Sequence, residues 1–346
     1  MAAAYAAENN AYIPNHEASG KLIVDFARNP SDFSLLQYTQ MVPVKQSVGY
    51  YLKITPDNAA RIVTTDGNDH RWPDGQNAPL GNDNHKDFEF DKFATTRYIY
   101  PYTIGSKTVD QASWDIDAAY SRQSAQQEMT EKTLFGVTAL TTAGNYPAAH
   151  TATATALAGG KWDVSTTSTL YIKKSLMLAA KQIQIATLGV VKPKDLHLVI
   201  SPALALLMGN SQEIHDYLKG APSALAQVRG DVKTQNGQWG LPDRLYGFDV
   251  TIEDCVRISS KKGAATLSSD YVLGSTVAVL VARVGSLEGL YGSPSFSFLT
   301  CFAYEEMTVE SKNDTDNRRR IGRVISDYAF EVTAPSAGYL FTAVSA

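Results

Sequence analysis

Hydrophobic residues recur every three or four positions between residues 170 and 186, which is the spacing of one face of an α-helix. The apolar positions of this repeat are Leu170, Ile172, Leu176, Ala179, Ala180, Ile183 and Ala186. Residues 165–167 are Ser and Thr and can cap the first turn, while Gly189 and then Pro193 predict where the helix stops. We therefore expect a long amphipathic helix that buries one face.

Shorter apolar runs follow this helix. Residues 196–200 are almost entirely apolar and predict a short buried strand. Ser201 and Pro202 then combine an N-cap residue with proline at the first helical position. Residues 210–213 open a further helix, and its apolar face consists of Ile214, Tyr217 and Leu218.

Alternating residues predict two strands on either side of a long polar segment. The first strand spans residues 48–63 and the second spans residues 88–102. Aromatic residues at two-residue spacing mark the second strand: Phe88, Phe90, Tyr98, Tyr100 and Tyr102. Between the strands, residues 64–87 are dense in Asp, Asn, Gly and Pro, which form turns. Because a loop of this length is uncommon inside a compact domain, the pattern predicts a projecting hairpin.

A second long helix is predicted over residues 110–135, and at about 1.5 Å per residue it would be about 39 Å long. One side of it carries Trp114, Ala118, Ala125, Met129 and Lys132. Residues 136–160 are rich in Ala and Thr and are typical of a low-complexity connector. Residues 1–45 contain only scattered apolar residues, which predicts an extended arm: a disordered tail, or a segment that orders on a neighbouring subunit.

The last third of the chain predicts a series of strands. Residues 247–252 alternate, and residues 271–284 form a nearly continuous apolar run, as in a central strand buried on both faces. Residues 296–304 form an aromatic strand. A closing hairpin over residues 328–341 is predicted to return to the domain that holds the helix of residues 110–135.

Composition and charge narrow the functional classes. The chain has 346 residues, of which 44% are hydrophobic and 19% are charged. This length and composition are typical of a folded protein with one large domain or two smaller ones. A net charge of −4 argues against a general nucleic-acid binder, although it does not exclude a container for DNA. No run of 18 apolar residues predicts a membrane span, and the first residues lack the features of a secretory signal.

The order of these elements and four short motifs resemble the tailed-bacteriophage major capsid proteins, which have the Hong Kong 97-type fold. The motifs are Trp162-Asp163, Lys192-Pro193, residues 196–202 ending in Ser-Pro, and residues 214–219, which read Ile-His-Asp-Tyr-Leu-Lys. The resemblance implies an α+β capsid fold. The implied parts are an N-terminal arm (1–45), an extended hairpin loop (46–104), a peripheral domain with a long spine helix (105–160), an axial domain (161–317) and return strands of the peripheral domain (318–346).

The resemblance implies a structural protein and not an enzyme. Its subunits would self-assemble as pentamers and hexamers into an icosahedral head shell around phage double-stranded DNA. The implied location is the virion, after assembly in the cytoplasm of the host bacterium, with scaffold, portal and decoration proteins as partners and without a membrane. Two alternatives remain: an encapsulin-like nanocompartment around a protein cargo, and an uncharacterised α/β enzyme.

The sequence offers no recognisable catalytic motif. It contains no Walker A loop, no Gly-x-Gly-x-x-Gly, no His-Glu-x-x-His, no Cys-x-x-Cys and no Gly-x-Ser-x-Gly. The six histidines are dispersed: His16, His70, His85, His150, His197 and His215. We therefore predict no catalytic, cofactor-binding or metal-binding residue. Cys255 and Cys301 are predicted to be buried free thiols, with a disulfide as the alternative.

Three polar groups have candidate roles. The loop of residues 64–87 has oxygen-bearing side chains that suit a hard cation, but their spacing fits no EF-hand and turn formation explains them better. These side chains are Asp66, Asn68, Asp69, Asp83, Asn84 and Asp87. A basic cluster consists of Arg318, Arg319, Arg320 and Arg323. We expect this cluster to pair with carboxylates of a neighbouring subunit; packaged DNA and solvent are the alternatives.

Some capsids of this fold carry a covalent Lys–Asn cross-link between subunits. Lys86 and Lys92 lie in or beside the predicted hairpin. The sequence identifies no Asn or acidic partner for either lysine. No cross-link is therefore predicted.

Overall fold

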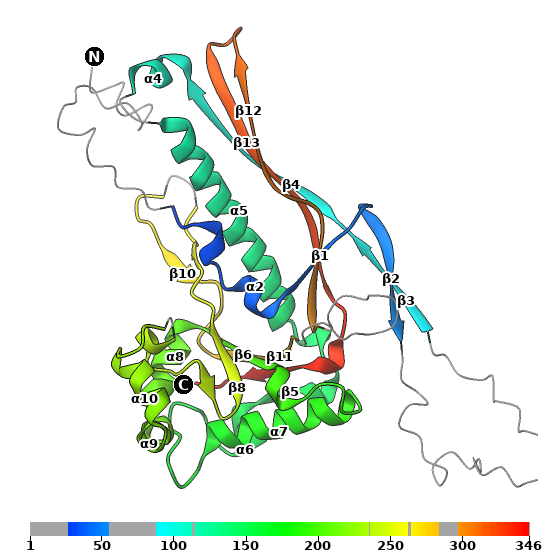
Figure 1. The fold of residues 1–346 in the computed structure, drawn as a ribbon, viewed down its shortest axis with the longest axis vertical. Helices are drawn as coiled ribbons and strands as arrows, with labels where there is room; N and C mark the ends of the chain where they lie inside the picture. Colours follow the sequence, from blue (N-terminus) through cyan, green and yellow to red (C-terminus); the bar gives the residue numbers. More distant parts are fainter. Residues whose placement is uncertain are drawn as a thin grey trace, which may run out of the picture.

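The computed structural model describes residues 27–54, 88–112, 115–234, 236–261, 264–283 and 297–345. Two sheets organise these residues, as the sequence predicted for an α+β protein (Figure 1). A four-stranded sheet lies along one long helix, and a six-stranded sheet is surrounded by shorter helices (Figure 1). Two small two-stranded sheets complete the structure in the described ranges.

The four-stranded sheet has the order β1-β12-β13-β4. Its strands are β1 (Gln40–Pro43), β12 (Leu299–Asp314), β13 (Arg319–Val332) and β4 (Thr96–Gly105). The pairing of β1 with β12 is parallel, and the other two pairings are antiparallel. The long β12–β13 hairpin carries the sheet well beyond the six-stranded sheet (Figure 1).

The long helix α5 (Ile116–Thr141) lies against β13 and β4 and has 26 residues. A separate short helix, α4 (Ser106–Gln111), precedes it. The predicted helix over residues 110–135 is therefore confirmed, but it begins and ends later than expected. Asp115 sets its start, because the Asp115 carboxylate accepts a hydrogen bond of 3.1 Å from the backbone N–H of Ala118.

The six-stranded sheet has the order β5-β14-β11-β6-β8-β7. Its strands are β5 (Thr151–Thr153), β14 (Gly338–Thr342), β11 (Val277–Ala282), β6 (Leu196–Ile200), β8 (Phe248–Ile252) and β7 (Arg244–Leu245). Its helices are α6 (Ala154–Ala158), α7 (Tyr171–Ala186), α8 (Pro202–Gly209), α9 (Gln212–Gly220) and α10 (Pro222–Arg229). The amphipathic helix and the buried strand predicted over residues 170–186 and 196–200 are confirmed as α7 and β6.

Smaller elements connect these parts. One further short helix is α2 (Leu35–Tyr38). The remaining strands are β2 (Val48–Ile54), β3 (Phe88–Ala94), β9 (Val256–Ile258) and β10 (Ser269–Tyr271). Short 3-10 turns are η2 (Pro30–Asp32), η3 (Ala143–Asn145), η4 (Ala148–His150), η5 (Pro193–Asp195), η6 (Gly237–Trp239) and η8 (Pro335–Ala337). Among the described residues, no helix combines the length and the apolar character that crossing a membrane requires.

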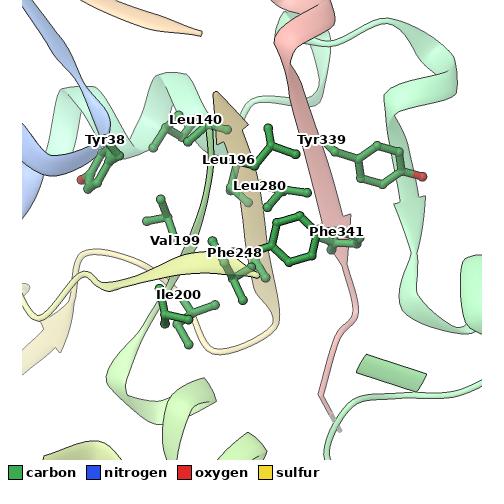
Figure 2. Close-up of a cluster of buried hydrophobic side chains, with 14 of the residues drawn as sticks. Tyr38, Leu140, Leu196, Val199, Ile200, Phe248, Leu280, Tyr339 and Phe341 are labelled. Atoms are coloured by element: carbon green, nitrogen blue, oxygen red, sulfur yellow. The ribbon is translucent and has the colours of Figure 1, made fainter. Parts of the chain in front are cut away.

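One continuous hydrophobic core joins the two sheets. Figure 2 shows side chains of β6, β8 and β11, among them Leu196, Phe248 and Leu280, between Tyr339 and Phe341 of β14 and the pair Tyr38 and Leu140. Tyr38 comes from α2 and Leu140 from α5, so the core extends from the six-stranded sheet to the long helix. The two sheets are therefore parts of one packed body.

Two predictions about strands are wrong. Residues 339–341 do not return to the lobe of the long helix, because β14 pairs with β11 and β5 in the six-stranded sheet. The tyrosines of residues 98–102 do not belong to a projecting hairpin, because they lie on β4, which pairs with β13. The predicted central strand of residues 271–284 is confirmed in its middle part, because β10 ends at Tyr271 and the buried strand β11 covers Val277–Ala282.

The Ala/Thr-rich segment of residues 136–160 is folded and is not a loose connector. It contains the last turns of α5, two 3-10 turns, β5 and α6. Tyr146, His150, Ala154 and Ala158 are buried within it. Small side chains here allow close packing, since Ala154 is fully buried in the shared core.

Candidate assembly surfaces

A two-stranded hairpin projects from the four-stranded sheet. β2 and β3 pair in antiparallel register over their whole length, with Ile54 opposite Phe88. The hairpin lies beyond β1, on the side away from α5 (Figure 1). The predicted strand of residues 88–102 is divided into β3 and β4, and the second half of the predicted strand of residues 48–63 lies outside the described residues. The connection of the hairpin, with the candidate cation ligands and Lys86, lies outside the described residues.

Stacked aromatic rings fix the base of the hairpin to the sheet. The ring of Phe302 on β12 lies 4.3 Å from that of Phe93 and 5.6 Å from that of Tyr51, measured between centroids. Gly49 makes room for this stack, because a Cβ atom there would lie 2.7 Å from Cζ of Phe93. The other face of the hairpin is open: Tyr50 is 70% exposed and Phe90 is 69% exposed. Large exposed aromatic side chains on a projecting element suit contact with another molecule.

The Phe302→Ala substitution is expected to loosen the hairpin while leaving the rest of the fold intact. The substitution removes the ring contacts of Phe302 with Phe93 and with Tyr51. Each contact stabilises the hairpin by about 1 kcal/mol in addition to the burial of apolar surface, so amide exchange in β2 and β3 should accelerate at least about tenfold. Hydrogen exchange with mass spectrometry measures this. Tyr304→Ala, on the same strand at an exposed position, is the matched control. Equal exchange in both variants would contradict the anchoring role.

An N-terminal strap, residues 27–39, passes between the two lobes. The predicted arm of residues 1–45 is wrong for this part, because Leu35 and Tyr38 are fully buried. Leu35 approaches α5 closely: a Cβ atom on Gly136 would lie 2.8 Å from Cδ1 of Leu35. The strap therefore fills the junction between the long helix and the six-stranded sheet.

Polar contacts hold the strap to both lobes. Glu253, just after β8, is fully buried and accepts hydrogen bonds from Ser34 (2.7 Å), Tyr38 (2.6 Å) and the backbone N–H of Cys255 (3.1 Å). Burial raises the pKa of Glu253, although these three hydrogen bonds oppose the shift. Burial likewise raises the pKa of Tyr38 well above its ordinary value, and the neighbouring Glu253 adds to that shift.

Arg28 extends the same connection to α5. Its guanidinium forms an ion pair of 2.9 Å with Asp254. Its backbone N–H donates a hydrogen bond of 3.0 Å to the side-chain oxygen of Gln126 on α5. The guanidinium also lies 4.7 Å from the centroid of the Phe33 ring. One residue of the strap thus contacts both lobes.

A second buried carboxylate, Glu213 of α9, caps α7 from a distance. Its oxygens accept hydrogen bonds from the backbone N–H groups of Ile172 (3.0 Å) and Lys173 (2.9 Å). The hydroxyls of Tyr246 (2.8 Å) and of Ser165 donate to the same carboxylate. Ser165 in turn accepts a hydrogen bond from the N–H of the first residue of α7, so the predicted capping by residues 165–167 is confirmed for Ser165. A negative charge at a helix N-terminus also complements the helix dipole.

An acidic and a basic side chain, Glu128 and Lys132, are buried between α5 and β13. Glu128 is fully buried, and neither of its carboxylate oxygens accepts a hydrogen bond within the described chain. Burial raises its pKa, while Lys132, one turn later on α5, acts in the opposite direction. The ammonium of Lys132 lies 4.8 Å from the ring centroid of Tyr328 on β13. The helix–sheet interface is therefore partly polar.

The predicted basic cluster lies at the far end of the β12–β13 hairpin, and three of its four arginines form ion pairs within the chain. Their ion pairs are Arg319 with Asp314 (2.8 Å), Arg320 with Asp117 (3.0 Å) and Arg323 with Glu310 (2.6 Å). The backbone of Arg318 is left-handed, with φ of 48°, at the turn of the hairpin. Pairing of this cluster with a neighbouring subunit therefore stays a prediction, and it would have to compete with the internal pairs.

The described residues do not converge on a catalytic centre. No three His, Cys, Asp or Glu side chains within the described ranges are grouped so that they could hold a metal ion. His150 is buried with Nδ1 2.9 Å from the carbonyl of Gly338. A groove of about 840 Å³ between α5 and β9 is lined mainly by Gln, Thr and aliphatic side chains. Its charged side chains are Glu131, which accepts a hydrogen bond of 2.7 Å from the hydroxyl of Tyr100, and Arg257, which forms no ion pair with Glu131. Such a lining offers hydrogen bonds and contact area, but no acid and base in contact with each other.

Both cysteines are free and buried, as predicted. Burial raises the pKa of Cys255 and of Cys301 to about 12 in each case. A thiol with so high a pKa is a poor nucleophile at neutral pH.

No protein-family model and no curated protein matches the sequence. Solved structures do match over nearly the whole chain. A crystal structure of a phage-related protein from Bordetella bronchiseptica shares 14% identity, covers 91% of this chain and 93% of its own, and has a TM-score of 0.58. The mature capsid of bacteriophage PhiM1 shares 13% identity over 96% of this chain and 91% of its own, with a TM-score of 0.55.

The chain has the Hong Kong 97-type capsid fold. A shell of a different kind has this fold as well. The holo encapsulin complex from Synechococcus elongatus shares 9% identity over 96% of this chain and 97% of its own, with a TM-score of 0.53. The predicted fold class is thus confirmed, and the fold alone does not separate a phage shell from a nanocompartment.

Proposed function

We propose that this chain is the major capsid subunit of a tailed bacteriophage and assembles into the icosahedral head shell around double-stranded DNA. The observation that carries the proposal is the end-to-end match of this fold to a chain from a mature phage capsid. Its role is structural, with the virion as its location. Scaffold, portal and decoration proteins are its expected partners, beside further copies of itself in pentamers and hexamers.

The parts of the fold take the corresponding roles. The lobe of α5 and the four-stranded sheet acts as the peripheral domain, and the lobe of the six-stranded sheet acts as the axial domain. The β2–β3 hairpin is the extended loop that reaches a neighbour, and its exposed Tyr50 and Phe90 support that role. Repeated weak contacts of this kind stabilise a closed shell.

An encapsulin-like nanocompartment is the second candidate, and the match to an encapsulin complex supports it. The contents of the particle distinguish the two. A phage shell would be packed with DNA when produced with its packaging proteins. A nanocompartment would instead enclose a protein cargo.

Expression of the full chain is expected to yield hollow isometric particles or rings of five and six subunits. Light scattering after size-exclusion chromatography and negative-stain microscopy measure this. A monomer of 37.6 kDa that persists at high concentration and with scaffold supplied would contradict the proposal.

A hairpin-shortened variant refines this experiment. Ile54 and Phe88 are register partners, so replacing residues 55–87 by Asn-Gly joins the strands with a tight turn. This variant should fold, as judged by circular dichroism, and should lose closed particles. Closed particles at the yield of the intact chain would contradict a role of the hairpin in assembly.

A further inference from the structure

The outer half of β12 is an unpaired edge of the four-stranded sheet. β1 covers β12 only from Thr300 to Ala303. From Thr308 to Asp314 the strand pairs with β13 on one side, and within the described chain no strand lies on the other side. Side chains 308–313 are all exposed, and Val309 is 54% exposed. β12 is the outermost strand where the hairpin extends away from the six-stranded sheet (Figure 1).

This edge is regular enough to accept another strand. The two irregularities of β12 lie between Ala303 and Glu305 and between Glu305 and Thr308. Beyond them the register with β13 is continuous to the end of the strand. A regular edge presents a row of unpaired backbone N–H and C=O groups, which is a template for strand addition.

The charges along this edge are complementary to those of the same edge in a second copy of the chain. If two copies pair in antiparallel register with Ser311 opposite Ser311, then Glu310 of each copy lies opposite Lys312 of the other. Registers centred on residue 310 or residue 312 would place two glutamates or two lysines opposite each other, which is unfavourable. In the described chain, Lys312 has no ion-pair partner, while Glu310 contacts Arg323. An added strand would therefore supply Lys312 with a carboxylate.

We propose that two copies of this chain join through this edge, so that residues 308–314 of both form a continuous antiparallel sheet across a two-fold axis. The contact is isologous, because the same edge serves both partners. The inference rests on the proposed function, since a single short edge contact is weak and gains stability when a shell repeats it. In a shell, the contact would link subunits across local two-fold axes.

A pair of cysteine variants tests the register. Ser311 and Asn313 are both exposed and lie on the same face of β12. S311C would place two thiols opposite each other, whereas N313C would place each thiol opposite Val309 of the second copy. Under mild oxidation we expect about tenfold more disulfide-linked dimer from S311C than from N313C on a non-reducing gel, because a disulfide needs close Cβ atoms. The buried native thiols provide the background.

A charge variant on the S311C background tests the complementarity. Adding K312E should reduce the dimer several-fold, because each added glutamate would face Glu310 of the second copy. Adding K181E instead, at an exposed position of α7, should leave the dimer unchanged. Equal yields of dimer from S311C and N313C, no dimer from either, or no effect of K312E would each overturn the proposal.

Particle formation is measured on the same samples. Particles without the S311C dimer would overturn the edge contact and leave the proposed function standing. The S311C dimer without particles would support the edge contact and count against the shell. The absence of both would overturn both.

Discussion

The Glu213→Ala substitution is expected to lower the free energy of unfolding by about 3–5 kcal/mol, because it leaves two buried and two part-buried donors without their acceptor. Two of these donors are the backbone N–H groups of Ile172 and Lys173 in the first turn of α7. No other side chain replaces the carboxylate there, since the N-cap residue Leu170 has no side-chain cap hydrogen bond and a left-handed backbone. The buried N–H of Ile172 and the part-buried N–H of Lys173 would then lack an acceptor.

Chemical denaturation of the unassembled protein, followed by tryptophan fluorescence, measures this loss. Trp162 is fully buried and donates a hydrogen bond to Ser175 of α7, so its emission reports on this region. Glu310→Ala is the matched control, because Glu310 is an exposed glutamate in an exposed ion pair, and it should cost less than about 1 kcal/mol. Equal losses in the two variants would show that Glu213 does not cap α7.

The sequence predicted the elements whose signals are local. The apolar repeat of α7 and the apolar run of β6 lie within short windows, so periodicity alone identifies them. The length of α5 was predicted as well, but its start was not, because Asp115 provides the cap and the residues before it form the separate helix α4. Boundaries depend on single capping contacts, which a periodic pattern does not contain.

Partners that are distant in sequence could not be predicted. Ser34 and Glu253 are separated by 219 positions, and neither residue lies in a motif that signals the other. The sequence of β14 predicts a strand but does not indicate to which sheet it belongs. Its pairing with β11 and β5 places it in the six-stranded sheet. The buried carboxylates Glu128, Glu213 and Glu253 were missed for the same reason, since acidic residues are mostly exposed and their burial depends on distant donors.

The strap illustrates how a segment without periodicity can still be structural. Only Phe33, Leu35 and Tyr38 of residues 27–39 are large buried apolar side chains, too few to suggest an element of its own. They become buried because α5 and the six-stranded sheet leave a junction between them, which these side chains fill. Glu253 accepts hydrogen bonds from the hydroxyls of Ser34 and Tyr38, which lie in the same junction. The strap is thus stabilised by the lobes that it joins.

This arrangement predicts a pH dependence that originates in Glu253. Its pKa is raised in the folded chain, mainly by burial. Ionisation of Glu253 therefore favours unfolding: its stabilising contribution is complete below the ordinary pKa of a glutamate and is lost as the pH rises through the raised value. Glu253→Gln cannot ionise, so relative to this variant the native chain should lose stability as the pH rises above the ordinary pKa of a glutamate.

Two variants and two pH values separate charge from hydrogen bonding. Glu253→Gln keeps a polar side chain that Ser34, Tyr38 and the N–H of Cys255 can contact, whereas Glu253→Ala leaves them unpaired and should cost about 2–4 kcal/mol at both pH values. Burial raises the pKa of Tyr38 well above its ordinary value and the pKa of Cys255 to about 12, so both groups stay protonated at either pH and the comparison reports on Glu253. Denaturation curves at pH 5 and pH 8 provide the measurement. A constant difference between the native chain and Glu253→Gln would mean that Glu253 does not titrate in this range, and the strap would then be held independently of pH.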